Sequence, residues 1–273
     1  MENRFPKYSF AKRLRSMLKV DFRRLGKSRL FYSLLACALL IPIVMTVMLT
    51  MMDGSVSVDP QTGAETVIHG PESIWQSIGT LPSGETADPA APMGGMDVMA
   101  MCNINMMFML VAVFVCLFVS DDFRSGYAKN LFTVRAKKGE YIVSKTLAGF
   151  ACGGGMLILY FVGSVLGGLI CGLSADLGVL TVGNLVMCIC AKVCLMLVFV
   201  SIFVLISVAA KQKAWASICG SLGGGMLLFM TVPMITPLNS TILHVLLCLA
   251  GGVLFAVGMG VAAKTVLKKT SLV

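Results

Sequence analysis

The residues best suited to binding or chemistry lie in one charged segment between two apolar runs. Residues 118–150 have the sequence FVSDDFRSGYAKNLFTVRAKKGEYIVSKTLAGF, which combines carboxylates, bases and aromatic rings in a chain with only 13% charged residues. Asp121 and Asp122 end an apolar run, Gly126 breaks the helix, and a short amphipathic helix can restart at Tyr127. A helix that presents rings and bases beside a membrane is suited to docking a partner protein. The residues that we expect at this contact are Asp122, Arg124, Gly126, Tyr127, Lys129, Asn130, Phe132, Arg135, Lys138, Glu140 and Tyr141.

Two further residues are candidates for contact with a substrate. Lys192 lies about nine residues into an apolar run, where a charge costs about 2.5–3.5 kcal/mol and usually faces protein or a water-filled cavity. It is a substrate-contacting or gating cation, unless it snorkels to the interface or its helix begins later than the run suggests. Trp75 is the second candidate, in a potential short helix over residues 71–81 at the membrane interface.

Catalysis finds little support in the sequence. The chain lacks a G-x-x-x-x-G-K loop followed by Ser or Thr, so it has no such cradle for ATP phosphates. Its two histidines, His69 and His244, lie far apart, and no pair of carboxylates falls within an apolar run. Most of the ten cysteines sit in apolar runs, where cysteine behaves as a small hydrophobe. We therefore expect a non-catalytic chain without a metal or cofactor of its own.

Long apolar runs determine the fold class. A bilayer core about 30 Å thick takes about 20 residues of helix, and a chain in lipid must satisfy its backbone hydrogen bonds internally. We identify six such runs in this 273-residue chain, at 30–52, 98–119, 147–171, 183–209, 215–232 and 241–263. The sequence thus predicts an all-α polytopic membrane protein with six spans. Its domains are a cytoplasmic segment, 1–29, and a single transmembrane domain, 30–273.

Charge sets the orientation. Residues 1–29 hold ten bases and residues 120–146 hold six, whereas residues 53–97 hold seven acids and no base. The positive-inside rule places both termini and the 120–146 loop in the cytoplasm, and the 53–97 loop outside as a small cap or a mobile loop. Although the pI is about 9.1, the bases flank apolar runs, so we expect them to face the lipid bilayer and not a nucleic acid.

Two local patterns refine this layout. Residues 7–27 alternate bases with apolar residues, which predicts a basic amphipathic helix on the inner leaflet; a solvated positive flank is the alternative. Pro42 would kink the first span. Glycines spaced by four predict close helix packing, at Gly149/Gly153, Gly163/Gly167, Gly168/Gly172 and Gly220/Gly224.

The charged segment also resembles a known family. Its Asp121-Asp122 pair, Gly126, the step Lys129-Asn130-Leu131, Lys137-Lys138 and Lys145 are similar to the cytoplasmic loop of type-2 ATP-binding-cassette (ABC) transporter permeases. The resemblance implies that residues 120–146 carry a coupling helix between the second and third spans. It also implies cytosolic ATPase partners that bind ATP and Mg²⁺, and a second permease copy or a homologous permease. The plasma membrane of a bacterium would be the location.

An ABC exporter is accordingly the function that we expect. Closure of the ATPases would push on residues 122–141 and tilt the first, second and fifth spans. Lantibiotic-immunity members of the family suggest a peptide or another amphipathic substrate. The alternative is a non-transporting membrane sensor or assembly scaffold that binds a cytosolic partner through the same loop. Ion-coupled transport would require charges deep in several helices, and Lys192 alone does not meet that requirement.

Overall fold

The computed structural model describes residues 9–58, 65–67, 70–71, 73–79, 103–134, 138–177, 180–211, 213–229 and 231–269. Apart from a short hairpin, these residues are mainly helical. The elements are α1 (Phe10–Leu25), α2 (Arg29–Met51), β1 (Val56–Val58), β2 (Glu65–Val67), the 3-10 helix η1 (Ile74–Ser77), α4 (Met106–Arg124), α5 (Tyr127–Val134), α6 (Lys138–Ile170), α7 (Val182–Ala210), α8 (Ala214–Phe229), α9 (Val232–Ile235) and α10 (Ile242–Lys269).

Five of the described helices, α2, α4, α6, α7 and α10, are long and apolar enough to cross a membrane. The run predicted at 215–232 is divided between α8, which has 16 residues, and α9. Pro233 lies at the start of α9, and a proline inside a continuing helix would clash with the preceding turn and remove a hydrogen bond. The apolar run is therefore longer than the helix that it forms.

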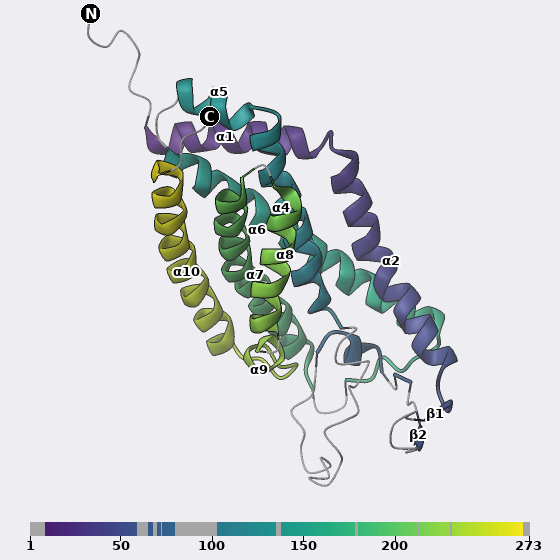
Figure 1. Ribbon diagram of the computed structural model, residues 1–273. Helices are drawn as coiled ribbons and strands as arrows, with labels where there is room; N and C mark the ends of the chain where they lie inside the picture. The colour runs from purple at the N-terminus through teal and green to yellow at the C-terminus, as the bar shows by residue number, and fades with distance from the viewer. Residues whose placement is uncertain are drawn as a thin grey trace, which may run out of the picture.

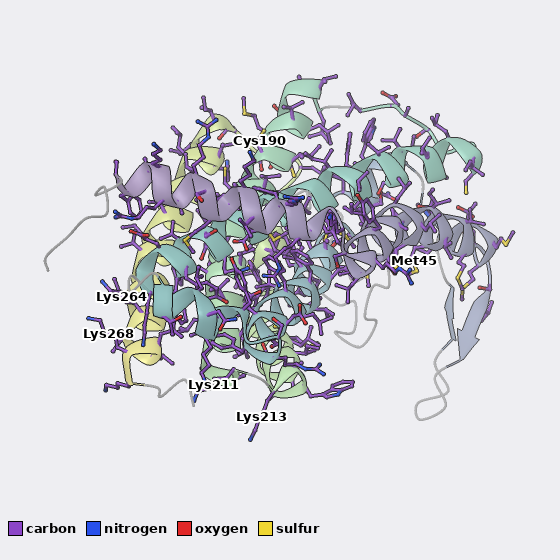
Figure 2. The ribbon with its side chains drawn as sticks, turned by 90° about the horizontal axis from the view of Figure 1, so that it is seen from above. Met45, Cys190, Lys211, Lys213, Lys264 and Lys268 are labelled. Atoms are coloured by element: carbon purple, nitrogen blue, oxygen red, sulfur yellow. The ribbon has the colours of Figure 1, made fainter. Side chains whose placement is uncertain are left out.

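Helices α1 and α5 lie at one end of the helices, and the hairpin and α9 lie at the other end (Figure 1). At the first end, α1 lies across the bundle, α5 lies beside it, and α10 finishes there. The other end carries β1, β2 and α9. Helix α2 lies at the side of the bundle, where it packs against α6. Figure 2 looks down on the first end, where Lys211, Lys213, Lys264 and Lys268 lie. We call it the basic end.

The N-terminal helix is amphipathic as predicted, but part of its apolar face packs on protein. Met17, Asp21 and Leu25, spaced by four, are buried, while Phe10 and Phe22 remain exposed, at 51% and 44%. The helix therefore has one face for the bundle and one that still presents rings to its surroundings.

A close approach joins α2 to α6. A Cβ placed on Gly163 would meet the carbonyl oxygen of Leu39, and it would lie 2.6 Å from Cγ of Pro42. At Gly167 a Cβ would be 3.0 Å from the Cα of Ile43. The spacing Gly163/Gly167 thus provides the close packing that the sequence predicts.

The core is built on α4 and α7, with aromatic rings at its centre. Phe108 of α4 and Phe199 of α7 have ring centroids 4.5 Å apart, and both side chains are buried. Tyr160 of α6 is also fully buried. These contacts fix the helices whose ends form the site described below.

The bounds of α4 and α6 differ from those of the apolar runs. The second run, expected at 98–119, forms α4 from Met106 to Arg124, so Asp121 and Asp122 lie within the helix. The third, expected at 147–171, forms α6 from Lys138, so Glu140, Tyr141 and Lys145 belong to its first turns. Polar side chains continue these helices because they are paired with one another, as the next section describes.

Candidate functional site

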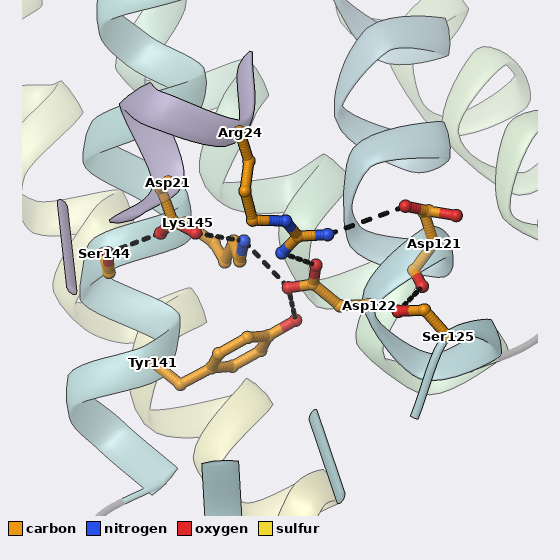
Figure 3. Close-up of polar contacts among 8 residues, drawn as sticks. All are labelled: Asp21, Arg24, Asp121, Asp122, Ser125, Tyr141, Ser144 and Lys145. Atoms are coloured by element: carbon orange, nitrogen blue, oxygen red, sulfur yellow. Dashed lines mark hydrogen bonds and ion pairs between the residues drawn. The ribbon is translucent and has the colours of Figure 1, made fainter. Parts of the chain in front are cut away.

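A buried ion network joins α1, α4 and α6 at the basic end (Figure 3). Asp122 is fully buried near the end of α4. Its Oδ1 accepts a hydrogen bond from Nη1 of Arg24, and its Oδ2 lies 2.8 Å from Nζ of Lys145 and 3.0 Å from the hydroxyl of Tyr141. One carboxylate thus receives donors from α1 and from α6.

Asp21 completes the network from α1. Its Oδ1 lies 2.7 Å from Nζ of Lys145, and its Oδ2 accepts a hydrogen bond of 2.7 Å from the hydroxyl of Ser144. Lys145 therefore bridges two carboxylates that come from different helices. The side chains of Asp21, Asp122 and Lys145 are at most 3% exposed.

The charges within this network balance. Asp21 and Asp122 carry two negative charges, and Arg24 and Lys145 carry two positive ones. A buried charge is tolerated only when it is paired and hydrogen-bonded. Burial of Arg24 acts to lower its pKa, but the charge and hydrogen bond of Asp122, together with Asp21 and Tyr127, raise the pKa of the guanidinium above its ordinary value. Arg24 also lies 3.6 Å from the exposed Asp121.

Aromatic rings connect α5 to the network. The Arg24 guanidinium lies 4.5 Å from the ring centroid of Tyr127, and Nζ of Lys145 lies 3.8 Å from that of Phe118. Phe132 of α5 meets the ring of Tyr141 edge-on, with centroids 5.3 Å apart. Both ends of α5 thus rest on residues that contact Asp122.

The turn between α4 and α5 depends on Gly126. Its φ is +72°, in the left-handed region where a Cβ is strained. The predicted break and the restart of a helix at Tyr127 are confirmed by this geometry.

The eleven predicted partner-binding residues differ in their exposure. Exposed side chains belong to Arg124, Lys129 and Asn130, while Tyr127, Phe132 and Lys138 are half-buried. Asp122, Glu140 and Tyr141 are buried, so they present no surface to a partner in this structure. Arg135 lies outside the described residues.

The buried members have internal partners instead. Glu140 pairs with Arg13 of α1, at 2.8 Å from Nη2 and 2.9 Å from Nε. Lys138 donates from Nζ to the carbonyl of Leu267 at 2.8 Å, and so ties the start of α6 to the end of α10. The first turns of α6 are thus anchored to α1, α4 and α10.

Asp21 and Arg24 were not among the predicted site residues, although the sequence holds a signal for the first. Asp21 is the one acid within the basic helix 7–27, and it lies four residues from Met17 and from Leu25 on the apolar face. A carboxylate on a face that packs against protein needs a buried cation. The sequence does not say which cation provides the pairing.

Lys192 forms a second buried polar cluster. Its side chain is fully buried, and Nζ lies 2.8 Å from Oδ1 of Asn105 and 3.0 Å from Oγ1 of Thr236. Since α7 begins at Val182 and the amine is buried, the two alternatives of a later helix start and of snorkelling are wrong. Lys192 instead links α7 to the residue before α4 and to the residue after α9.

Trp75 makes contacts of its own. Its indole Nε1 donates to the carbonyl of Ala175 at 3.2 Å, which holds η1 against the segment after α6. The ring packs against a small apolar cluster that includes Leu185 and Cys188 of α7. The structure therefore does not bring Trp75 and Lys192 into contact through any described hydrogen bond.

Comparison with protein-family models, with curated proteins and with solved structures finds no match to this chain. The function of this chain is therefore inferred from its residues and their geometry.

Proposed function

We propose that this chain is the membrane-spanning permease subunit of an ABC exporter. In this proposal α8, continued by α9, is the fifth of six spans, the basic end faces the cytoplasm, and both termini lie there. Separate cytosolic ATPase subunits bind ATP and Mg²⁺. A second permease, identical or homologous, completes the pathway in the plasma membrane of a bacterium.

The attachment of α5 is the observation that carries the proposal. A helix of eight residues lies across the basic end, with Lys129 and Asn130 exposed. Its other face meets the buried network through Tyr127 and Phe132. A force applied to such a helix reaches α1, α4 and α6 together, because Asp122 and Lys145 join all three.

In the proposed cycle, α5 transmits closure of the ATPases to the spans. Packed interfaces with discrete arrangements convert a small displacement at one end into a change of helix tilt. The substrate class is a peptide or another amphipathic compound, and Lys192 and Trp75 are the residues that we assign to its pathway.

Co-purification tests the proposal. The tagged chain, extracted in a mild detergent from its own cells, should carry a stoichiometric soluble ATPase. The double variant Lys129→Glu, Asn130→Ala should reduce that recovery by at least roughly tenfold, since reversing a charge at a contact costs more than about 1.4 kcal/mol. Lys213→Glu is the matched control, because Lys213 is exposed at the same end on the α7–α8 turn; it should have no effect.

The result that would overturn the proposal is equally specific. A chain that purifies without any ATPase, in the presence or absence of nucleotide, is not an ABC permease. A different protein lost with the same α5 variant would indicate a sensor or a scaffold.

A further inference from the structure

An apolar groove lies between α6 and α10 and opens toward the basic end. It has a volume of about 380 Å³. The walls are almost entirely apolar, with Ile142, Val143 and Leu147 from α6 facing Val253, Val257 and Val261 from α10. Gly260 lies in the same wall, and a Cβ built on it would meet no atom within 4 Å. The groove is therefore open along α10.

A basic hollow continues the groove at its polar end. It has a volume of about 710 Å³ and is lined by Arg13, Lys138, Lys264 and Lys268, together with Glu140. Lys264 and Gly139 line both spaces, so the hollow adjoins the groove. Four bases face one acid there, which gives the hollow a net positive charge.

Two of these four bases, Lys264 and Lys268, have no ion pair among the described residues. Arg13 is paired with Glu140, and Lys138 donates to Leu267. Lys264 and Lys268 are one turn apart on α10, and Figure 2 shows both extending from the same side of that helix. Neither forms an ion pair within the part of the chain that the structure describes. Their charge is available to a ligand.

The length of the groove fits one leaflet of a bilayer. From Val253 to Lys264 is a rise of roughly 16 Å at about 1.5 Å per residue, which is about half of a hydrocarbon core of about 30 Å. Basic pockets between spanning helices bind the headgroups of anionic lipids. We infer that the groove binds an anionic phospholipid, with one acyl chain between α6 and α10 and its phosphate at Lys264 and Lys268.

A second copy of this chain is a poorer occupant of the same face. A two-fold contact places the same patch of both subunits together. The four bases of one hollow would then approach the four bases of the other, and like charges repel. This inference does not depend on the exporter function, because it concerns only the groove and its charges.

Native mass spectrometry of the purified full-length chain tests the inference. The chain should retain phosphatidylglycerol over phosphatidylcholine of the same acyl composition. Lys264→Gln with Lys268→Gln should weaken phosphatidylglycerol binding by roughly 10- to 30-fold, from about 1 kcal/mol for each base near a membrane surface. Lys269→Gln is the matched control on the same turn, and it should leave the preference unchanged.

The groove itself is tested by filling it. Gly260→Leu should weaken binding of both lipids, because its side chain enters the space for the acyl chain. Gly258→Leu is the control, since a Cβ built on Gly258 would also meet no atom within 4 Å, but Gly258 does not line the groove. Thermal unfolding of each variant in detergent verifies that it is folded.

Four results would overturn the inference. The first is equal binding of the two lipids by the unchanged chain, and the second is an equal loss of binding with Lys269→Gln. The third is full displacement of the lipid by millimolar inorganic phosphate, which would make the hollow a site for a soluble anion. A change of oligomeric state in Gly260→Leu, with lipid binding unchanged, would assign the face to a second copy.

Discussion

Lys145 of α6 contacts Asp21 of α1 across 124 positions of sequence, with 2.7 Å between Nζ and Oδ1. The same Nζ lies 2.8 Å from Oδ2 of Asp122. A single amine thereby holds the N-terminal helix against the ends of two long helices, and its loss would leave two carboxylates buried together.

Lys145→Met tests how much this amine contributes. The substitution keeps the length of the side chain and removes its charge, so Asp21 and Asp122 lose their shared partner. We expect the free energy of unfolding in detergent to fall by about 3–5 kcal/mol. Lys129→Met, on the exposed face of α5, should change it by less than about 0.5 kcal/mol.

A double variant makes the prediction specific to the pair. Asp21→Asn should destabilise alone, and its combination with Lys145→Met should cost less than the sum of the two, by about 0.5–3 kcal/mol. Strict additivity would mean that the two groups do not interact.

The hydroxyl of Tyr141 should stabilise the fold only through its hydrogen bond to Asp122. Tyr141→Phe removes a hydrogen bond of 3.0 Å to a buried carboxylate but keeps the ring that meets Phe132. Hydrogen bonds to charged groups contribute about 1.5–3 kcal/mol, and we expect a loss of that size by thermal unfolding. Tyr32→Phe is the comparison, because that hydroxyl bonds the carbonyl of Gly26 at an exposed position; an equal loss there would contradict the assignment.

The close approach of α2 and α6 predicts a contrast between two glycines of one helix. A methyl group on Gly163 would meet Leu39 and Pro42, whereas one on Gly155 would meet nothing within 4 Å. Gly163→Ala should destabilise by about 1–3 kcal/mol, as overpacking does. Gly155→Ala should be neutral or stabilising, because alanine favours helix. Urea or thermal unfolding of both variants in the same detergent decides the matter, and similar values would rule out the close contact.

The polar cluster around Lys192 predicts a rescue. Asn105→Leu removes an acceptor 2.8 Å from a buried amine, and we expect the free energy of unfolding to fall by about 1.5–3 kcal/mol, the contribution of a hydrogen bond to a charged group. Adding Lys192→Met should restore most of the lost stability, because both polar partners are then replaced by apolar groups. If the double variant were as unstable as Asn105→Leu, the buried amine of Lys192 would not be the cause of the destabilisation.

The apolar runs and the glycine signals predicted much of the architecture. The first and fourth runs match α2 and α7 within a residue or two, and Gly126 marks the turn before α5. The runs misplaced the start of α6 at residue 147 because Glu140 and Lys145 read as loop charges. A prediction from hydropathy ends an apolar helix at a charged residue. In the folded chain, however, a charged residue that is paired can lie within the helix.

The partners of those charges could not be predicted in the same way. Asp21 and Lys145 are brought together only by the packing of α1 on α6, and a single sequence gives no distance between segments so far apart. Likewise, Lys192 finds Asn105 and Thr236 across segments that no local pattern connects. Local periodicity specifies elements, while such pairings depend on their assembly.

The neutrality and burial of the network determine how it responds to dissolved salt. Mobile ions screen exposed charges over a Debye length of about 8 Å at physiological ionic strength, but they screen buried pairs much less. The contact between Arg24 and the exposed Asp121 should weaken as salt rises, whereas the bridge from Asp21 through Lys145 to Asp122 is closed to counterions. The joint between α1, α4 and α6 should therefore be equally strong at low and at high ionic strength.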